Sequence, residues 1–138
     1  MKRYLVTALA YLVPTFMLGY VWHLVLFASR YERLAMYRHD VVIPLGFSSM
    51  LIQAGIFAWA CQRLTERGMS VSSAAWRYGL LGAALSWSFT TLAVAAKNVM
   101  SSVSDYFIME SAFTATQWVL VLRPRLLDHR TLAGGIRF

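Results

Sequence analysis

An acidic residue, Glu110, lies well inside an apolar stretch that runs from Val103 to Leu122. The stretch is long enough to cross a bilayer as a helix. An ionisable group within such a span is costly unless it faces protein or a water-filled cavity. Thr114 and Gln117 follow Glu110 by four and seven residues, so a helix places all three on one face. The spacing therefore predicts a helix whose polar face other helices must cover.

His23 is the candidate partner of Glu110, because both residues fall at a similar depth. At 1.5 Å per residue, His23 lies about 9 Å from the outer end of the first apolar run. Glu110 lies about 10 Å from the start of its own run by the same rise. If the polar stripes face inward, the two side chains meet in the outer third of the bilayer. The residues predicted around the pair are Ser48, Ser49, Thr90 and Thr91, with Gln53 and Gln117 deeper.

A polar layer of this kind has two interpretations. It could form a small cavity that binds a ligand or handles a proton, with Glu110 as the titratable group and His23 as its partner. It could also be structural, because Ser, Thr, Gln and His side chains hydrogen-bond across helices in many inert bundles. Trp87, in the third apolar run, could line such a pocket or simply pack. The sequence leaves both interpretations open.

Several other chemistries are excluded by residue counts. The single cysteine, Cys61, rules out an intrachain disulfide, a CxxC redox motif and a thiolate metal cage. Bis-histidine haem needs two histidines in the spans, and only His23 lies in one. A serine-protease triad, a phosphate-binding glycine-rich loop and a zincin motif are all absent from the sequence. We therefore predict no catalytic residue, no metal site and no cofactor.

The elements that must position these residues are helices in a membrane. Of the 138 residues, 59% are hydrophobic and only 14% are charged, and mean hydropathy is +0.54. Soluble domains are typically about 25% charged. We predict an all-α transmembrane four-helix bundle forming one domain over residues 1–138, with a helix end at Pro124 and a mobile Gly134–Gly135. The predicted spans are residues 4–28, 42–62, 76–97 and 103–122, followed by a cytoplasmic tail over 123–138.

Charge predicts the orientation of this bundle. The net charge is +7, but the basic residues sit at the ends of apolar runs rather than in a cluster, so we predict no nucleic-acid partner. Positive charge is retained on the cytoplasmic side, which predicts that both termini lie there. One side holds Lys2, Arg3, Arg63, Arg67, Arg77, Arg123, Arg125, Arg130 and Arg137, and the other holds Arg30, Arg33, Arg38 and Lys97.

The third and fourth spans carry a recognisable pattern. Small residues, Gly79, Gly82, Ala83 and Ser86, lie on one side of the third span and allow a neighbouring helix to approach closely. A glycine-rich span with a central Trp87, followed by a short turn and a span with Glu110 in its first half, resembles families of small bacterial four-span membrane proteins of unknown function. The resemblance implies a multi-pass protein of the bacterial inner membrane and implies no activity.

Three functions fit these features. The first is a non-catalytic accessory subunit or assembly factor that packs against a larger membrane complex. The second is a transporter or channel protomer that uses Glu110 for proton or ion coupling. The third is a binder of a lipophilic small ligand, or a membrane enzyme, at the His23–Glu110 layer. The predicted partners are membrane lipids together with other membrane subunits or further copies of this chain.

Overall fold

Every element of the described chain is a helix. The computed structural model describes residues 1–37 and 40–133, and its side chains as far as residue 122. The first helix, α1 (Lys2–Val21), continues directly into a π-helical turn, η1 (Trp22–Leu26), and α4 (Val71–Trp87) continues through a second one, η2 (Ser88–Ala93). The remaining elements are α2 (Ala28–Arg33), α3 (Ile43–Glu66), α5 (Val94–Lys97) and α6 (Val103–Ala133).

Three helical segments of the described chain are long and apolar enough to cross a membrane. They are Lys2–Leu26, Ile43–Glu66 and Val71–Lys97. These segments indicate a membrane protein. The predicted fourth span lies in α6, which is not among the three, because Asp105 and Glu110 lower its hydropathy.

Local sequence signals set the connection between α3 and α4. Gly68 has a φ of +84°, a left-handed conformation that glycine adopts without steric strain. Its N–H donates to the Thr65 carbonyl, and the next N–H, of Met69, donates to the Leu64 carbonyl, which together cap the end of α3. Ser70 then caps α4, because its hydroxyl accepts a hydrogen bond from the Ser73 N–H at 3.2 Å.

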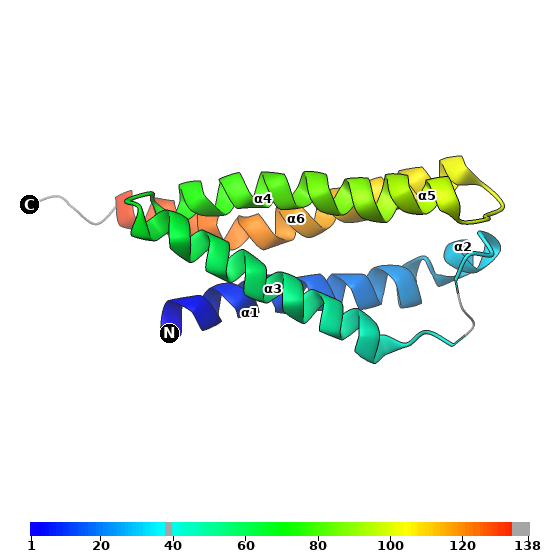
Figure 1. Ribbon diagram of the computed structural model, residues 1–138, viewed down its shortest axis with the longest axis horizontal. Coiled ribbons are helices and arrows are strands. Elements are labelled where there is room, and N and C mark those ends of the chain that lie inside the picture. The colour runs from blue at the N-terminus through cyan, green and yellow to red at the C-terminus, as the bar shows by residue number, and fades with distance from the viewer. Residues whose placement is uncertain (38–39, 134–138) are drawn as a thin grey trace, which may run out of the picture.

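The helix α6 packs against both α4 and α1, and α3 packs against α1 and α4 (Figure 1). The small residues predicted for close approach face α6. A Cβ added at Gly79 would lie 2.7 Å from Leu122 Cδ2, and one at Gly82 would lie 2.7 Å from Trp118 Cζ2. A larger residue at either glycine would therefore require a side chain of α6 to move.

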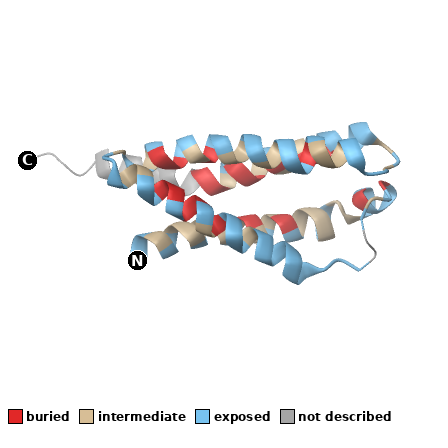
Figure 2. Cartoon of the chain, in the orientation of Figure 1, coloured by how far each residue is buried: buried red, intermediate tan, exposed pale blue. Residues whose placement is uncertain are grey.

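Two hydrophobic clusters hold the helices together, and they lie in different halves of the molecule. The larger cluster joins α1, α3, α4 and α6 and contains Tyr11, Phe57, Ala75 and Trp118. The second cluster joins α2 to α6 and contains Tyr31, Leu34, Tyr106 and Met109, with no residue from α3. Burial in α3 accordingly begins only at Ala54, and the first turns of that helix are exposed (Figure 2).

The end of α6 differs from the prediction. The helix does not stop at Pro124 but runs on to Ala133. A proline removes one hydrogen bond from a helix, and the remaining bonds of a long helix can outweigh that loss. The predicted mobility of Gly134–Gly135 concerns residues outside the described part of the chain.

Candidate functional site

The polar face of α6 is buried, as its spacing predicts. Glu110, Thr114 and Gln117 are 4%, 6% and 7% exposed. Burying a carboxylate without partners is strongly unfavourable, so the groups that contact Glu110 determine what this face can do.

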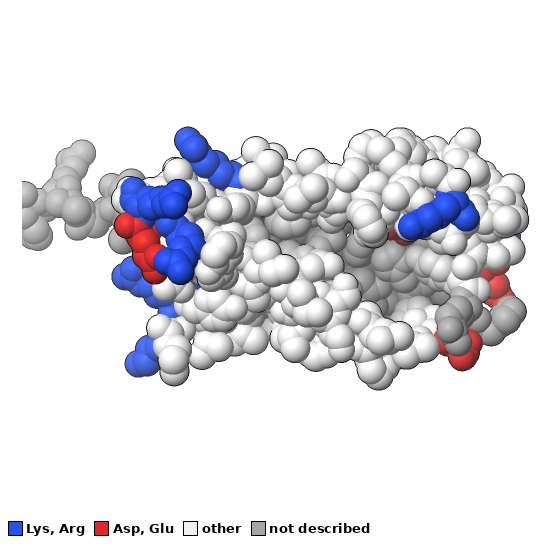
Figure 3. Space-filling view, viewed as in Figure 1, with Lys and Arg blue, Asp and Glu red and all other residues white. Residues whose placement is uncertain are grey.

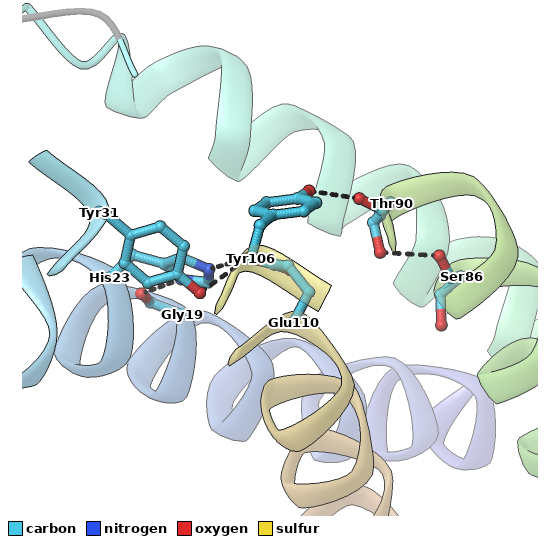
Figure 4. Close-up of polar contacts among 7 residues, drawn as sticks. All are labelled: Gly19, His23, Tyr31, Ser86, Thr90, Tyr106 and Glu110. Carbon is cyan, nitrogen blue, oxygen red and sulfur yellow. Dashed lines mark hydrogen bonds and ion pairs between the residues drawn. The ribbon is translucent and has the colours of Figure 1, made fainter. Parts of the chain in front are cut away.

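The predicted contact between His23 and Glu110 is present. His23 Nε2 lies 3.3 Å from Glu110 Oε1, and His23 Nδ1 lies 2.9 Å from the Gly19 carbonyl oxygen (Figure 4). Gly19 and His23 extend the buried stripe of Tyr11 and Thr15 along α1. His23 itself lies in the π-helical turn η1 at the end of that helix, and π-helical turns occur frequently at functional sites.

A second donor, Tyr31 of α2, completes the contacts of the carboxylate. Its hydroxyl donates a hydrogen bond of 2.7 Å to Glu110 Oε1, and the residue is only 1% exposed (Figure 4). The sequence gives no signal for this contact, because Tyr31 follows the first span in what reads as a connecting loop. One oxygen of Glu110 thus joins η1, α2 and α6.

Burial raises the pKa of the Tyr31 phenol above its ordinary value, and the charge of Glu110 and the hydrogen bond to it raise that pKa further. Tyr31 therefore keeps its proton at neutral pH and remains a donor. The hydrogen bond is consistent with this, because a carboxylate oxygen can accept but cannot donate.

The two contacts of His23 engage both nitrogens of its ring. A carbonyl oxygen only accepts, so the contact with Gly19 requires a hydrogen on Nδ1. A hydrogen bond between Nε2 and Glu110 then requires one further proton, carried by either the imidazole or the carboxyl group.

Aromatic rings, rather than the predicted hydroxyls, surround this pair. The His23 ring lies 4.8 Å from the ring of Tyr31 and 4.5 Å from that of Phe113, measured between centroids. Tyr37 stacks on Tyr31 at 4.9 Å with an interplanar angle of 3°. The expectation of a serine and threonine shell was wrong, because the segment after α1 folds back and places its tyrosines there.

Most of the predicted hydroxyl residues hydrogen-bond elsewhere. The Thr90 hydroxyl donates to the Ser86 carbonyl, and the Thr90 carbonyl accepts from the Tyr106 hydroxyl (Figure 4). Ser48 donates to the Pro44 carbonyl within α3. The Thr91 side chain is buried but has no hydrogen-bond partner among the described residues. None of these hydroxyls contacts Glu110 in the described structure.

Trp87 also lies away from the pair. Its indole N–H donates to the Ser111 hydroxyl at 2.9 Å, and its ring meets Phe107 edge to face. These contacts join α4 to α6, so Trp87 has a packing role here.

The deeper glutamines form a separate network around Tyr11. The Tyr11 hydroxyl donates to Gln53 Oε1 at 2.6 Å and accepts from Gln117 Nε2 at 3.3 Å. Gln53 Nε2 in turn donates to the Ser49 hydroxyl at 3.2 Å. This network joins α1, α3 and α6, and it matches the interhelical hydrogen bonding of the structural interpretation.

A pocket opens beside the His23–Glu110 pair. It has a volume of about 530 Å³ and lies where the first half of α3 diverges from α1. His23 and Phe113 contribute to its inner wall, and Figure 3 shows this half of the molecule hollowed. The walls are mostly apolar, with Phe16 and Phe47 in edge-to-face contact at 5.3 Å. We call this space the α1–α3 pocket.

The described residues offer no metal site, since no three His, Cys, Asp or Glu side chains come together among them. Comparisons with protein-family models, curated proteins and solved structures give no match for this chain. The candidate site is thus defined by its own geometry.

Proposed function

We propose that this chain is a four-span protein of a bacterial inner membrane that binds a lipophilic small molecule in the α1–α3 pocket. The observation that carries the proposal is the pocket itself, whose volume of about 530 Å³ falls within the range of small-ligand sites. Its walls are apolar, and a few polar groups lie at one end, as in most small-ligand sites.

The unequal packing of α3 supports lateral entry of the ligand. The helix is anchored at Ala54, Phe57 and Cys61, whereas residues 41–49 are exposed. In a bilayer those exposed turns would face acyl chains, so a lipophilic molecule could reach the pocket without crossing water.

The orientation is part of the proposal. Lys and Arg gather at the end of the molecule that holds the N-terminus and the α3–α4 connection (Figure 3). Positive charge marks the cytoplasmic side. In this orientation α6 is the fourth span, and its polar face is tolerated because α1 and α2 cover it.

Single cysteines test the orientation, because Cys61 is the only native one. In a Cys61→Ala background, Arg67→Cys and Ser101→Cys place one thiol in each of two opposite connections. A membrane-impermeant maleimide applied to intact cells whose outer membrane has been permeabilised should label only residue 101. Labelling of residue 67 alone would reverse the orientation, and labelling of both or neither would contradict the four-span topology.

The binding function is tested by filling the pocket. Gly46 lines it, and a Cβ added there meets nothing within 4 Å, so Gly46→Leu can occupy the space without disturbing the fold. Ser48→Leu is the matched control, because Ser48 is exposed on the same helix and does not line the pocket.

The measurement is mass spectrometry of lipophilic molecules that co-purify from native membranes. We expect one species at near-stoichiometric amounts with the wild type and Ser48→Leu, and its loss with Gly46→Leu. An accessory subunit would instead co-purify with larger proteins, and its bound lipids would not respond to Gly46→Leu.

A further inference from the structure

We infer that the α1–α3 pocket takes an uncharged lipid whose polar group accepts a hydrogen bond from Tyr37. The inference rests on the proposed binding function and adds the chemical class of the ligand. Three features of the described pocket carry it: the absence of charge on its walls, the state of its hydrogen-bonding groups, and the shape of its apolar part.

The walls select against a charged head group. The described residues that line the pocket include no Lys, Arg, Asp or Glu. His23 is the nearest candidate cation, but its Nε2 already contacts the Glu110 carboxylate and its Nδ1 the Gly19 carbonyl. A carboxylate or phosphate placed there would lose its hydration without gaining a cation of its own. A cationic head group would likewise find no unshared carboxylate among the described lining residues.

The hydrogen-bonding groups leave a donor for the ligand. Both ring nitrogens of His23 and the hydroxyl of Tyr31 are already engaged, by Gly19 and by Glu110. The Tyr37 hydroxyl has no hydrogen bond within the described structure, and Tyr37 lines the pocket. A phenol near neutral pH is a donor, so it pairs best with a carbonyl, ester or ether oxygen.

Tyr37 is also held in place. Its ring stacks on Tyr31 at 4.9 Å, and Tyr31 is fixed by its bond to Glu110. Tyr20 is the other pocket tyrosine with a free hydroxyl among the described residues, and both tyrosines are partly exposed, but Tyr20 makes no such ring contact there. A pre-positioned donor gives up less entropy on binding than a mobile one, so Tyr37 is the one we assign.

The apolar part of the pocket fits a flexible chain. Met36 and Met50 lie on its walls, and methionine side chains adapt to irregular shapes. Together these features describe a neutral molecule with a long apolar body and one acceptor group, such as a fatty ester.

The test uses three matched probes with the purified full chain in detergent at pH 9: methyl dibromostearate, dibromostearate and dibromo-octadecane. Bromine quenches nearby tryptophan fluorescence, and the Trp22 ring lies 5.9 Å from that of Phe113 on the pocket wall. The part of the quenching that is lost in Gly46→Leu reports binding in the pocket. The part that remains reports probe dissolved in the micelle.

We expect the ester to bind at least 10-fold more tightly than the anion. Tyr37→Phe should weaken ester binding about 3- to 10-fold, the range for one neutral hydrogen bond, and leave the alkane unchanged. Tyr20→Phe, the matched control, should change neither. Equal binding of ester and anion, or an unaltered ester affinity in Tyr37→Phe, would overturn this inference while leaving the binding function intact. No Gly46→Leu-sensitive quenching by any probe would instead overturn the binding function.

Discussion

Replacing Glu110 with methionine removes the acceptor that α1 and α2 share. Methionine has nearly the same length but lacks the carboxylate. The Tyr31 hydroxyl and His23 Nε2 would both lose their partner, at 2.7 Å and 3.3 Å respectively. The structure therefore predicts that Tyr31 and His23 are each energetically coupled to Glu110, and that the two couplings differ in size.

The geometry sets the magnitudes. The Tyr31 bond has the optimal length for O–H···O, whereas the His23 contact is longer than the usual limit of about 3.2 Å for N–H···O. Hydrogen bonds to charged groups contribute about 1.5–3 kcal/mol in soluble proteins. Interhelical bonds within membranes average about 0.6 kcal/mol, because the unfolded helices find other partners in the bilayer. We expect about 1.5 kcal/mol for Tyr31–Glu110, since Tyr31 lies outside the spans, and about 0.6 kcal/mol for His23–Glu110.

Double-mutant cycles measure these couplings directly. Tyr31→Phe and His23→Phe are each combined with Glu110→Met, and the free energy of unfolding is obtained from SDS titrations in mixed micelles, followed by circular dichroism. Tyr106→Phe is the control, because the Tyr106 hydroxyl donates to the Thr90 carbonyl instead of Glu110. The coupling free energy between Tyr106 and Glu110 should therefore be close to zero. A larger coupling for His23 than for Tyr31, or none above the Tyr106 control, would refute the reasoning.

The same titrations test two glycine positions. Gly82→Ala should lower the free energy of unfolding by about 1–3 kcal/mol, because its Cβ would lie 2.7 Å from Trp118 Cζ2, in a ring that a hydrogen bond to Ser86 holds in place. The double variant Gly82→Ala with Trp118→Phe should lose less free energy of unfolding than the sum of the two single variants. Gly46→Ala should not lower the free energy of unfolding, because a Cβ at that position meets open space. Gly68→Ala should lower the free energy of unfolding by about 1–2 kcal/mol, because alanine is strained at a φ of +84°. Gly68→Asn should lower it by less, because asparagine adopts the left-handed conformation more readily. Equal effects of the two substitutions would contradict a conformational cause.

Helical periodicity determined which faces are buried. The spacing of Glu110, Thr114 and Gln117 predicted one polar face on α6, and all three side chains are buried. The contact between His23 and Glu110 also followed from sequence, because a constant rise per residue allows depth to be counted along each helix. Such properties are local to one helix, so neighbours need not be known to infer them.

The tertiary structure alone decided what surrounds Glu110. The segment after α1 folds back so that Tyr31 reaches the carboxylate, a contact between residues 79 positions apart. Hydrogen-bond partners so distant in sequence depend on how a connection turns, and hydropathy carries no information about that. Ser48 and Thr90, which the depth count placed around the pair, instead donate to backbone carbonyls of their own helices.

The α1–α3 pocket likewise arose only from packing. Ala54, Ala58 and Cys61 are small, and they allow the second half of α3 to approach its neighbours closely. The first half carries the larger Leu45 and Phe47 and diverges from α1. The sequence determined that α3 is an apolar helix, but both halves are apolar, so only the fit of side chains between helices decided which half packs and which leaves a space.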